Sequence, residues 1–239
     1  MTTSERNFEP VMSERRVSLI GALFVAMGPV TLALYTPAMT QIIEALHTTQ
    51  AMVNLTMTLY FGGFATAQLV AGPISDALGR KPVTFVFMGI FLLATLVALV
   101  APTIEVLIAA RFVQGIGASA GIAISRAIVR DLYRGDTSAR IMNLIGIILA
   151  VGPAFAPTLG GAMLQLFGWR SIFFFMALMG VAVVLVTAFS LKETVVADRS
   201  RFNVASLISS YGQLLTNAHF MATTLTLAGA IGAVYTMMT

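Results

Sequence analysis

The sequence predicts an all-α membrane protein, with six transmembrane helices in one bundle, a polar connector and a seventh transmembrane helix. The first observation is composition: the chain has 239 residues, of which 58% are hydrophobic and only 10% are charged. A soluble domain carries about 25% charged residues. The second is that the apolar residues gather in runs near the ~20 residues that cross a bilayer as a helix. The third is that these runs lack the alternation of apolar and polar residues that is typical of membrane-barrel strands. In lipid, the backbone of such a run can form all its hydrogen bonds only as a helix.

Each apolar run is assigned to one helix. Polar residues 1–16 form the expected cytoplasmic N-terminus, and residues 17–191 form the expected six-helix bundle. The first run is too long for the apolar core of a secretory signal. The six runs cover residues 17–39, 51–71, 83–100, 103–125, 141–167 and 171–191.

The polar connector covers residues 192–217. Val204, Ile208, Tyr211 and Leu215 recur there at helical spacing, so we expect an interfacial amphipathic helix on the cytoplasmic surface. A regulatory partner site is the alternative reading. Residues 218–239 form the seventh expected span and the start of an incomplete second bundle.

The basic residues predict the orientation. Twelve of them fall in the N-terminus or in the loops on one side, Arg170 alone lies on the other, and Arg111 lies within a span. By the positive-inside rule, the side that carries most of the basic residues is cytoplasmic, and so is the N-terminus.

Several function classes are excluded. The chain has no cysteine, and its two histidines, His47 and His219, lie far apart in sequence. We therefore expect no metal site, no cofactor and no enzyme activity. The bases sit in short loops without interleaved aromatic residues, which argues against nucleic acid as a partner.

A polar, charged turn at residues 72–82 separates the second and third runs. Gly72 and Pro73 are expected to end the second helix, and Gly79 permits a tight backbone turn. Asp76, Arg80 and Lys81 are placed to pair with one another or with helix ends. A positively charged topology anchor is the simpler alternative.

The fourth and fifth runs carry unusual residues. Arg111, with Gln114 three residues later, lies inside a span, where a charge costs about 2.5–3.5 kcal/mol at a helix centre. We expect Arg111 to face the protein interior or a water-filled cavity; snorkelling to the outer interface is the alternative. Gly117 and Gly121 are spaced for close helix contact. The fifth run should bend at its glycines and prolines, or be an ordinary kinked helix: Gly146, Gly152, Pro153, Pro157, Gly160 and Gly161. Trp169 is expected to be an interfacial anchor.

These motifs resemble those of the major facilitator superfamily, in order and spacing. The run at residues 72–82 resembles the signature loop between the second and third helices. The resemblance implies that Asp76, Arg80 and Asp131 belong to a cytoplasmic charge network that latches two halves in the outward-open state. The spacing of Arg111, Gln114 and Gly115 resembles the fourth-helix motif, which implies a role for Arg111 in proton coupling. The glycines and prolines of residues 152–161 resemble the antiporter motif of exporters.

The first run points to a subfamily. Tyr35-Thr36-Pro37-Ala38 resembles a motif of bicyclomycin- and chloramphenicol-type drug–proton antiporters. Many of those proteins carry an acid two positions before the tyrosine, where this chain has Ala33. No acid lies deep in any span, although a coupled proton needs a titratable group. Three explanations stay open: an acid in a missing half, a substrate charge that works with Arg111, or a different form of coupling.

The resemblance implies an alternating-access exporter of the inner membrane, driven by the proton gradient, for drugs or small amphipathic molecules. Polar residues within the spans are candidates for the lining of a substrate pocket near the midplane. The alternative for each is a structural hydrogen bond between helices. The candidates are Tyr35, Asn54, Tyr60, Gln68, Arg111, Gln114 and Asn143. Their low charge favours a neutral or mildly charged apolar substrate. The expected partners are the lipid bilayer, protons and the substrate.

One bundle has nothing to rock against, so we expect a truncated chain, or a second half from another chain or a homodimer. The alternatives are a remnant without autonomous transport that acts as a membrane interaction module, and an exporter of a metabolite such as a sugar or amino acid.

Overall fold

The computed structural model describes residues 10–198 and 204–237. It divides into two compact units, Met1–Asp198 and Arg199–Thr239, which are described separately. Every regular element in the described part of the chain is a helix, so the predicted all-α fold is confirmed.

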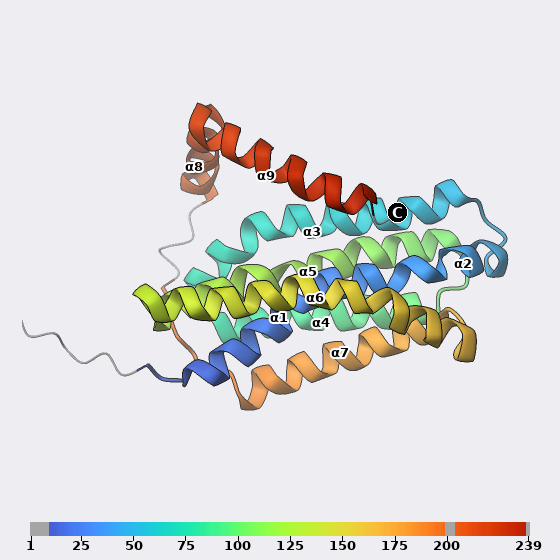
Figure 1. The fold of residues 1–239 in the computed structure, drawn as a ribbon, viewed down its shortest axis with the longest axis horizontal. Coiled ribbons are helices and arrows are strands. Elements are labelled where there is room, and N and C mark those ends of the chain that lie inside the picture. The colour runs from blue at the N-terminus through green and yellow to red at the C-terminus, as the bar shows by residue number, and fades with distance from the viewer. Residues whose placement is uncertain (1–9, 199–203, 238–239) are drawn as a thin grey trace, which may run out of the picture. The chain divides into compact units, whose positions relative to one another are not determined.

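Six long helices of the first unit lie side by side (Figure 1), and each falls on one of the six predicted apolar runs. A 3₁₀ turn and a short helix follow the first of them. The elements are α1 Glu14–Tyr35, η1 Thr36–Ala38, α2 Met39–Ala45, α3 Gln50–Leu78, α4 Arg80–Leu99, α5 Ile104–Leu132, α6 Gly135–Phe167 and α7 Arg170–Phe189.

Five helical segments are long and apolar enough to cross a membrane. They are Glu14–Ala45, Arg80–Leu99, Ile104–Leu132, Gly135–Phe167 and Arg170–Phe189. The second predicted span forms the 29-residue helix α3. It is not among the five, so its crossing of the bilayer stays a prediction.

The helix α5 packs against three neighbours through its glycines. A Cβ at Gly115 would meet the Tyr60 carbonyl of α3, and one at Gly117 would meet the Phe91 backbone of α4. A Cβ at Gly121 would meet the Phe24 carbonyl of α1. The predicted close contact at Gly117 and Gly121 is thus confirmed, and each glycine serves a different helix. Small residues allow this approach of backbones, as in membrane bundles generally.

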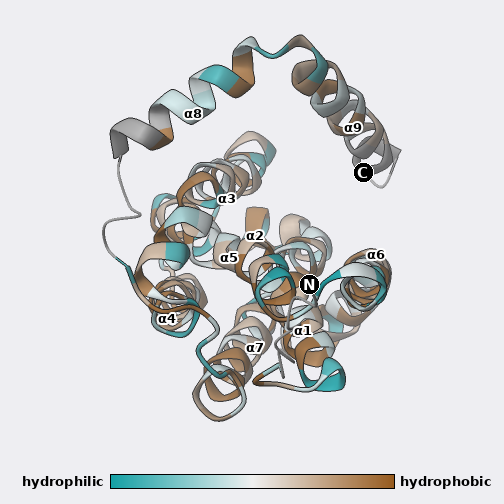
Figure 2. Cartoon of the chain, turned by 90° about the vertical axis from the view of Figure 1, so that its left-hand side faces the viewer, coloured by the Kyte–Doolittle hydropathy of each residue, from teal (hydrophilic) through white to brown (hydrophobic). Residues whose placement is uncertain are grey.

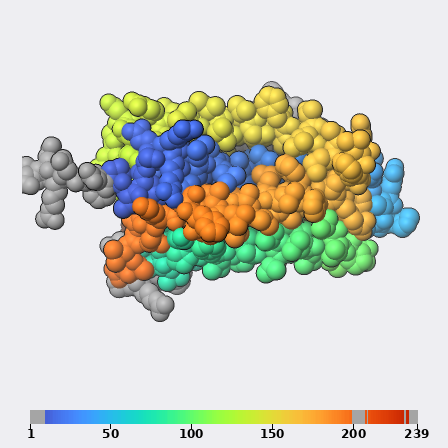
Figure 3. All heavy atoms as spheres, turned by 90° about the horizontal axis from the view of Figure 1, so that it is seen from below, coloured from blue at the N-terminus to red at the C-terminus, as the bar shows by residue number. Residues whose placement is uncertain are grey.

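The outer surface of the bundle is apolar. Figure 2 shows hydrophobic residues on the outward sides of α4 and α7 as well as within the bundle. Seen from below (Figure 3), α7 lies between α4 on one side and α1 and α6 on the other. Large side chains such as Phe155, Phe167 and Phe189 are exposed, as expected where lipid rather than water is the solvent.

The turn at residues 72–82 is shorter than expected. The prediction that Gly72 and Pro73 end the second helix is wrong, because α3 runs through both residues to Leu78. Proline keeps a helical φ, and membrane helices tolerate it where neighbouring groups satisfy the backbone. Gly79 alone links α3 to α4, with a φ of 100° that strains any residue with a side chain.

Pro153 and Pro157 lie inside α6, which is helical throughout Gly135–Phe167, so the predicted bend of this helix stays a prediction. One residue beyond this helix differs from expectation. Trp169 is buried, and its ring lies 6.0 Å from the Phe173 ring between centroids. The expected interfacial anchor is therefore wrong: Trp169 is a packing residue.

The second unit contains α8 Val204–Thr216 and α9 Ala218–Met237. A helix is thus confirmed within the predicted connector, while the side chains of Val204 and Ile208 lie outside the described residues. The helix α9 falls on the seventh predicted run, and its crossing of a bilayer stays a prediction. Residues 192–198 belong to the first unit, so the connector is divided between the two units.

Candidate functional site

Arg111 is fully buried on α5, which confirms that it faces the protein interior. Its guanidinium carbon lies 4.4 Å from the ring centroid of Tyr35 and 4.3 Å from that of Tyr60. Arg111 therefore makes cation–π contacts with two rings, one from α1 and one from α3. Three helices meet at this cation.

Both tyrosines are held by hydrogen bonds. Tyr60 donates its hydroxyl to the Gly28 carbonyl at 3.1 Å. The Tyr35 hydroxyl lies 2.8 Å from Thr56 Oγ1. Since Thr56 donates its own hydrogen to the Val53 carbonyl, Tyr35 is the donor in that pair. These bonds fix the two rings beside the guanidinium.

Gln114 extends the cluster toward α4. Arg111 Nη1 donates to Gln114 Oε1 at 2.6 Å, and Gln114 Nε2 donates to Thr95 Oγ1 at 2.8 Å. Thr95 in turn donates to the Phe91 carbonyl. Gln114 and Thr95 are fully buried, so the chain of bonds satisfies the Gln114 amide away from solvent.

Two donors of Arg111 remain without a partner. Among the described residues, neither its Nε nor its Nη2 has a hydrogen-bond acceptor, and no carboxylate lies within ion-pair distance of it. A buried donor that lacks an acceptor is unfavourable by about 1–3 kcal/mol, and more when it is charged. The cluster is thus a positive site with open donor capacity.

The other pocket candidates lie apart from this cluster. Asn54 is exposed near the start of α3, where its Oδ1 accepts a hydrogen bond from Gln50 at 2.9 Å. Gln68 is half-buried further along α3, and Asn143 is exposed near the start of α6. The structure therefore brings together Tyr35, Tyr60, Arg111 and Gln114, and separates the remaining three.

A second cluster surrounds Arg80 at the start of α4. Arg80 donates to Asp131 through Nε at 3.0 Å and through Nη2 at 3.3 Å. Its Nη1 donates to Ser75 Oγ at 2.6 Å and also forms an ion pair with Asp76. The side chain is only 4% exposed, while Asp76 is about half exposed at 51%. Three predicted residues, Asp76, Arg80 and Asp131, therefore meet.

The remaining residues of the turn have supporting positions. Lys81 Nζ donates to the Ala188 carbonyl of α7 at 2.8 Å, which ties the turn to that helix. The Gly72 carbonyl accepts a hydrogen bond from Ser75 Oγ at 2.8 Å, which helps to orient the hydroxyl that Arg80 contacts. Gly79 forms the turn itself.

In α6, two of the five predicted residues approach α1. A Cβ on Gly160 would lie 2.6 Å from the Leu34 carbonyl, and one on Gly152 would lie 3.0 Å from Val30 Cγ2. Gly161 has open space around it. With Pro153 and Pro157 inside the same helix, these residues form part of the α1–α6 contact.

Glu193 is the functional candidate that sequence reasoning missed. Its carboxylate accepts the backbone N–H of Arg80 at 2.9 Å and of Lys81 at 3.1 Å, and so caps α4. The next residue, Thr194, donates to Asp131 Oδ2 at 2.9 Å. The only available signal was an acid directly after a span, in a chain with ten acids in all.

With these two clusters in place, the comparisons identify the family. The family model described as Major Facilitator Superfamily matches residues 18–239. The chain belongs to the Major Facilitator Superfamily. This membership confirms the resemblance inferred from the motifs, and it makes the protein a member of a family of membrane transporters.

Several curated relatives are similar over most of the chain. An uncharacterized MFS-type transporter, YdgK of Bacillus subtilis, is 36% identical over 211 residues, which are 87% of this chain and 52% of that protein. Multidrug resistance protein D of Escherichia coli K12 is 33% identical, over 92% of this chain and 56% of that protein. Multidrug resistance protein MdtL of Shigella dysenteriae is 33% identical, over 78% of this chain and 49% of that protein. The chain thus spans about half the length of these relatives.

A solved structure shares the fold. The human organic anion transporter MFSD10 has a TM-score of 0.64 to this chain at 19% identity, over 82% of this chain and 53% of that one. At this identity the likeness concerns the fold alone.

Proposed function

We propose that the protein acts in proton-coupled efflux of drugs or small amphipathic molecules, by alternating access. The observation that carries the proposal is the pair of clusters on one helix: α5 holds the buried Arg111 and, twenty residues later, Asp131. Two relatives are named multidrug resistance proteins, which supports the substrate class.

Arg111 is proposed to act on the group that carries the proton. An arginine keeps its own proton, so Arg111 cannot be the group that titrates. A nearby cation favours the ionised form of an acid, and its open Nε and Nη2 donors suit an incoming carboxylate or a polar substrate group. Release of that group on protonation would couple proton movement to transport.

The Arg80 cluster is proposed to be the gate. Its residues join three helices and residues 193–194 by hydrogen bonds, so movement of the turn must break several of them. We place this end, and the N-terminus, in the cytoplasm of a cell whose inner membrane holds the protein, as the distribution of bases favours.

Efflux of a lipophilic dye from energised cells that express the protein tests this proposal. We expect efflux to stop when a protonophore collapses the proton gradient. Arg111→Ala and Asp76→Asn should each reduce the rate of efflux by tenfold or more. Lys192→Ala, at an exposed residue outside both clusters, is the matched control and should retain efflux. Efflux that survives both substitutions would contradict the assigned roles, and absence of gradient-dependent efflux would contradict the function.

A further inference from the structure

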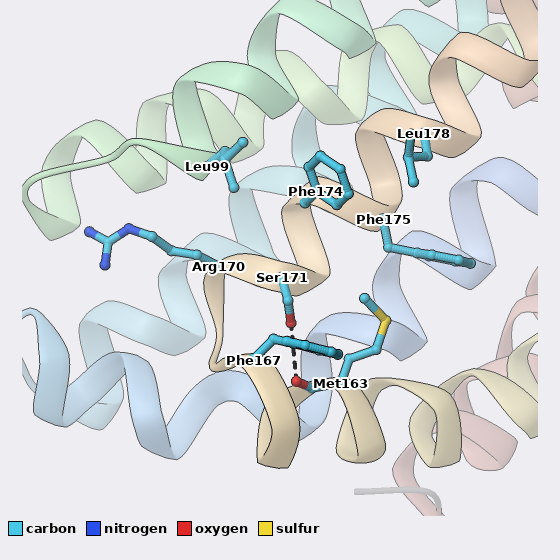
Figure 4. A pocket seen from close by; sticks show the side chains of 8 residues that line it. All are labelled: Leu99, Met163, Phe167, Arg170, Ser171, Phe174, Phe175 and Leu178. Atoms are coloured by element: carbon cyan, nitrogen blue, oxygen red, sulfur yellow. Dashed lines mark hydrogen bonds between the residues drawn. The ribbon is translucent and has the colours of Figure 1, made fainter.

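A groove lies on the bundle surface, away from both clusters. Its volume is about 440 Å³, and it lies between the last residues of α4 and α6 and the first turns of α7 (Figure 4). The lining residues are Leu99, Met163, Phe167, Arg170, Ser171, Phe174, Phe175 and Leu178.

The wall of the groove is apolar. Apart from Arg170, its one polar side chain is Ser171, whose hydroxyl lies within hydrogen-bond distance of the Gly168 carbonyl at 2.7 Å and the Met163 carbonyl at 3.2 Å. Phe174 and Leu178 are each about half exposed, at 55% and 51%. The groove therefore suits a hydrocarbon chain and offers little to a polar guest.

Arg170 lies at the edge of the groove, and its guanidinium extends away from the apolar side chains (Figure 4). It donates to the Ala101 carbonyl at 3.3 Å and lies 4.4 Å from the ring centroid of Trp169. These two contacts hold the guanidinium where α7 begins. No carboxylate of the described residues forms an ion pair with it.

The position of this cation is unusual within the chain. Among the bases of residues 10–198, Arg170 alone lies outside a span at its end of the bundle, and it occurs where α6 ends and α7 begins. Helix ends of a membrane bundle lie near the lipid headgroups, where a guanidinium binds phosphate oxygens with good geometry. A fixed cation directly beside an apolar groove matches the two parts of a phospholipid.

We propose that this groove binds an anionic phospholipid, with one acyl chain along Phe174 and Leu178 and the headgroup phosphate on Arg170. A zwitterionic lipid offers the same chain, but its own ammonium competes for the phosphate. The lipid that this site favours is therefore one with net negative charge, such as phosphatidylglycerol.

Trp169 provides the test, because it is the one tryptophan in the chain and stacks on Arg170. The purified protein is placed in phosphatidylcholine bilayers that contain rising fractions of phosphatidylglycerol or phosphatidylcholine with brominated acyl chains. Bromine quenches tryptophan fluorescence at short range, and each variant is normalised to its own signal in unbrominated lipid. We expect half-quenching at a several-fold lower fraction of brominated phosphatidylglycerol than of brominated phosphatidylcholine.

Two pairs of variants separate headgroup from chain. Arg170→Gln should make the two quenching curves coincide, whereas Arg134→Gln, at an exposed arginine at the opposite end, should leave the preference intact. Phe174→Ser places a hydroxyl in the groove and should weaken the preference, whereas Phe189→Ser on the exposed far end of the same helix should not.

The wild-type comparison alone decides the proposal if a variant fails to fold. Coincident phosphatidylglycerol and phosphatidylcholine curves in the wild-type protein would overturn it. So would a preference that survives Arg170→Gln or Phe174→Ser. Each of these readouts is independent of transport.

Discussion

At the scale of single residues, Arg111 is stabilised by aromatic faces instead of an acid. Insertion of an arginine at a helix centre costs about 2.5–3.5 kcal/mol. A desolvated cation–π contact contributes up to about 2 kcal/mol, and Arg111 makes two of them, with Tyr35 and Tyr60. The contacts thus offset a large part of the cost of keeping a charge inside the bundle without a carboxylate.

Removal of one ring should therefore cost more than removal of one hydroxyl. Tyr35→Leu is expected to lower the free energy of unfolding by about 3 kcal/mol, since it removes packing and one face of the cation site. Tyr35→Phe keeps the ring and loses only the bond to Thr56, at about 1 kcal/mol. Denaturant unfolding in detergent, followed by Trp169 fluorescence, measures both, because Phe173 contacts both Tyr35 and Trp169. If Tyr35→Leu and Tyr35→Phe lowered the free energy of unfolding equally, stabilisation of Arg111 by the ring would be contradicted.

Charge alone should not restore the function of Arg111. Arg111→Lys keeps the positive charge, but an ammonium lacks the planar surface that stacks on two rings and has no fork of donors for Gln114. Dye efflux by Arg111→Lys is expected to stay within about threefold of Arg111→Ala. Efflux near the wild-type level would show that the site requires only a point charge.

At the scale of elements, α5 packs closely against α1, α3 and α4, and these close contacts depend on glycine. A Cβ on Gly115 would overlap the Tyr60 carbonyl, which is backbone and cannot rotate away. The same movement would shift the Tyr60 ring beside Arg111. Packing of α3 on α5 and the geometry of the cation site are thus coupled.

Gly115→Ala should destabilise the bundle by at least 2–3 kcal/mol, in line with overpacked cores. Gly146→Ala, where nothing lies within 4 Å of the added Cβ, is the control and should be neutral or stabilising by up to about 1 kcal/mol, since alanine favours helix. Thermal melts in detergent compare the two. Similar melting temperatures for both variants would contradict the close approach of α3 and α5.

Glu193 provides a second element-scale prediction, because it caps α4 from outside that helix. Glu193→Ala should expose the amides of Arg80 and Lys81 and cost about 1 kcal/mol, as for other lost caps. Hydrogen–deuterium exchange of peptides around residues 79–84 is expected to speed up several-fold. Glu44→Ala, at an exposed acid near the opposite end, should leave that exchange unchanged. Unchanged exchange in Glu193→Ala would contradict the cap.

Hydropathy and charge predicted the helices and the burial of Arg111, because both follow from the cost of polar groups in lipid. The shape of the turn did not follow: Pro73 signals a helix end in water but is accommodated inside α3. The two tyrosine rings that contact Arg111 come from α1 and α3, so no local sequence pattern around Arg111 predicts them. Glu193 acts 113 residues from the amide that it caps, which sequence spacing cannot reveal.

At the scale of the whole molecule, one helix joins the two clusters. Arg111 and Asp131 are twenty residues apart on α5, which corresponds to about 30 Å along a helix. A change at Arg111 can therefore reach the Arg80 cluster only if α5 moves as a unit or its packing changes. Breaking of the Arg80–Asp131 pair would be the matching event at the other end.

Coupling of protons to substrate is the central claim, and proton movement in vesicles measures it most directly. The purified protein is placed in vesicles with an acidic lumen that contains a pH-sensitive dye, and a lipophilic substrate is added outside. Exchange of substrate for protons predicts a rise in luminal pH on addition, which Arg111→Ala abolishes and Lys192→Ala retains. A luminal pH that does not respond to substrate, or that responds equally in Arg111→Ala, would contradict the account.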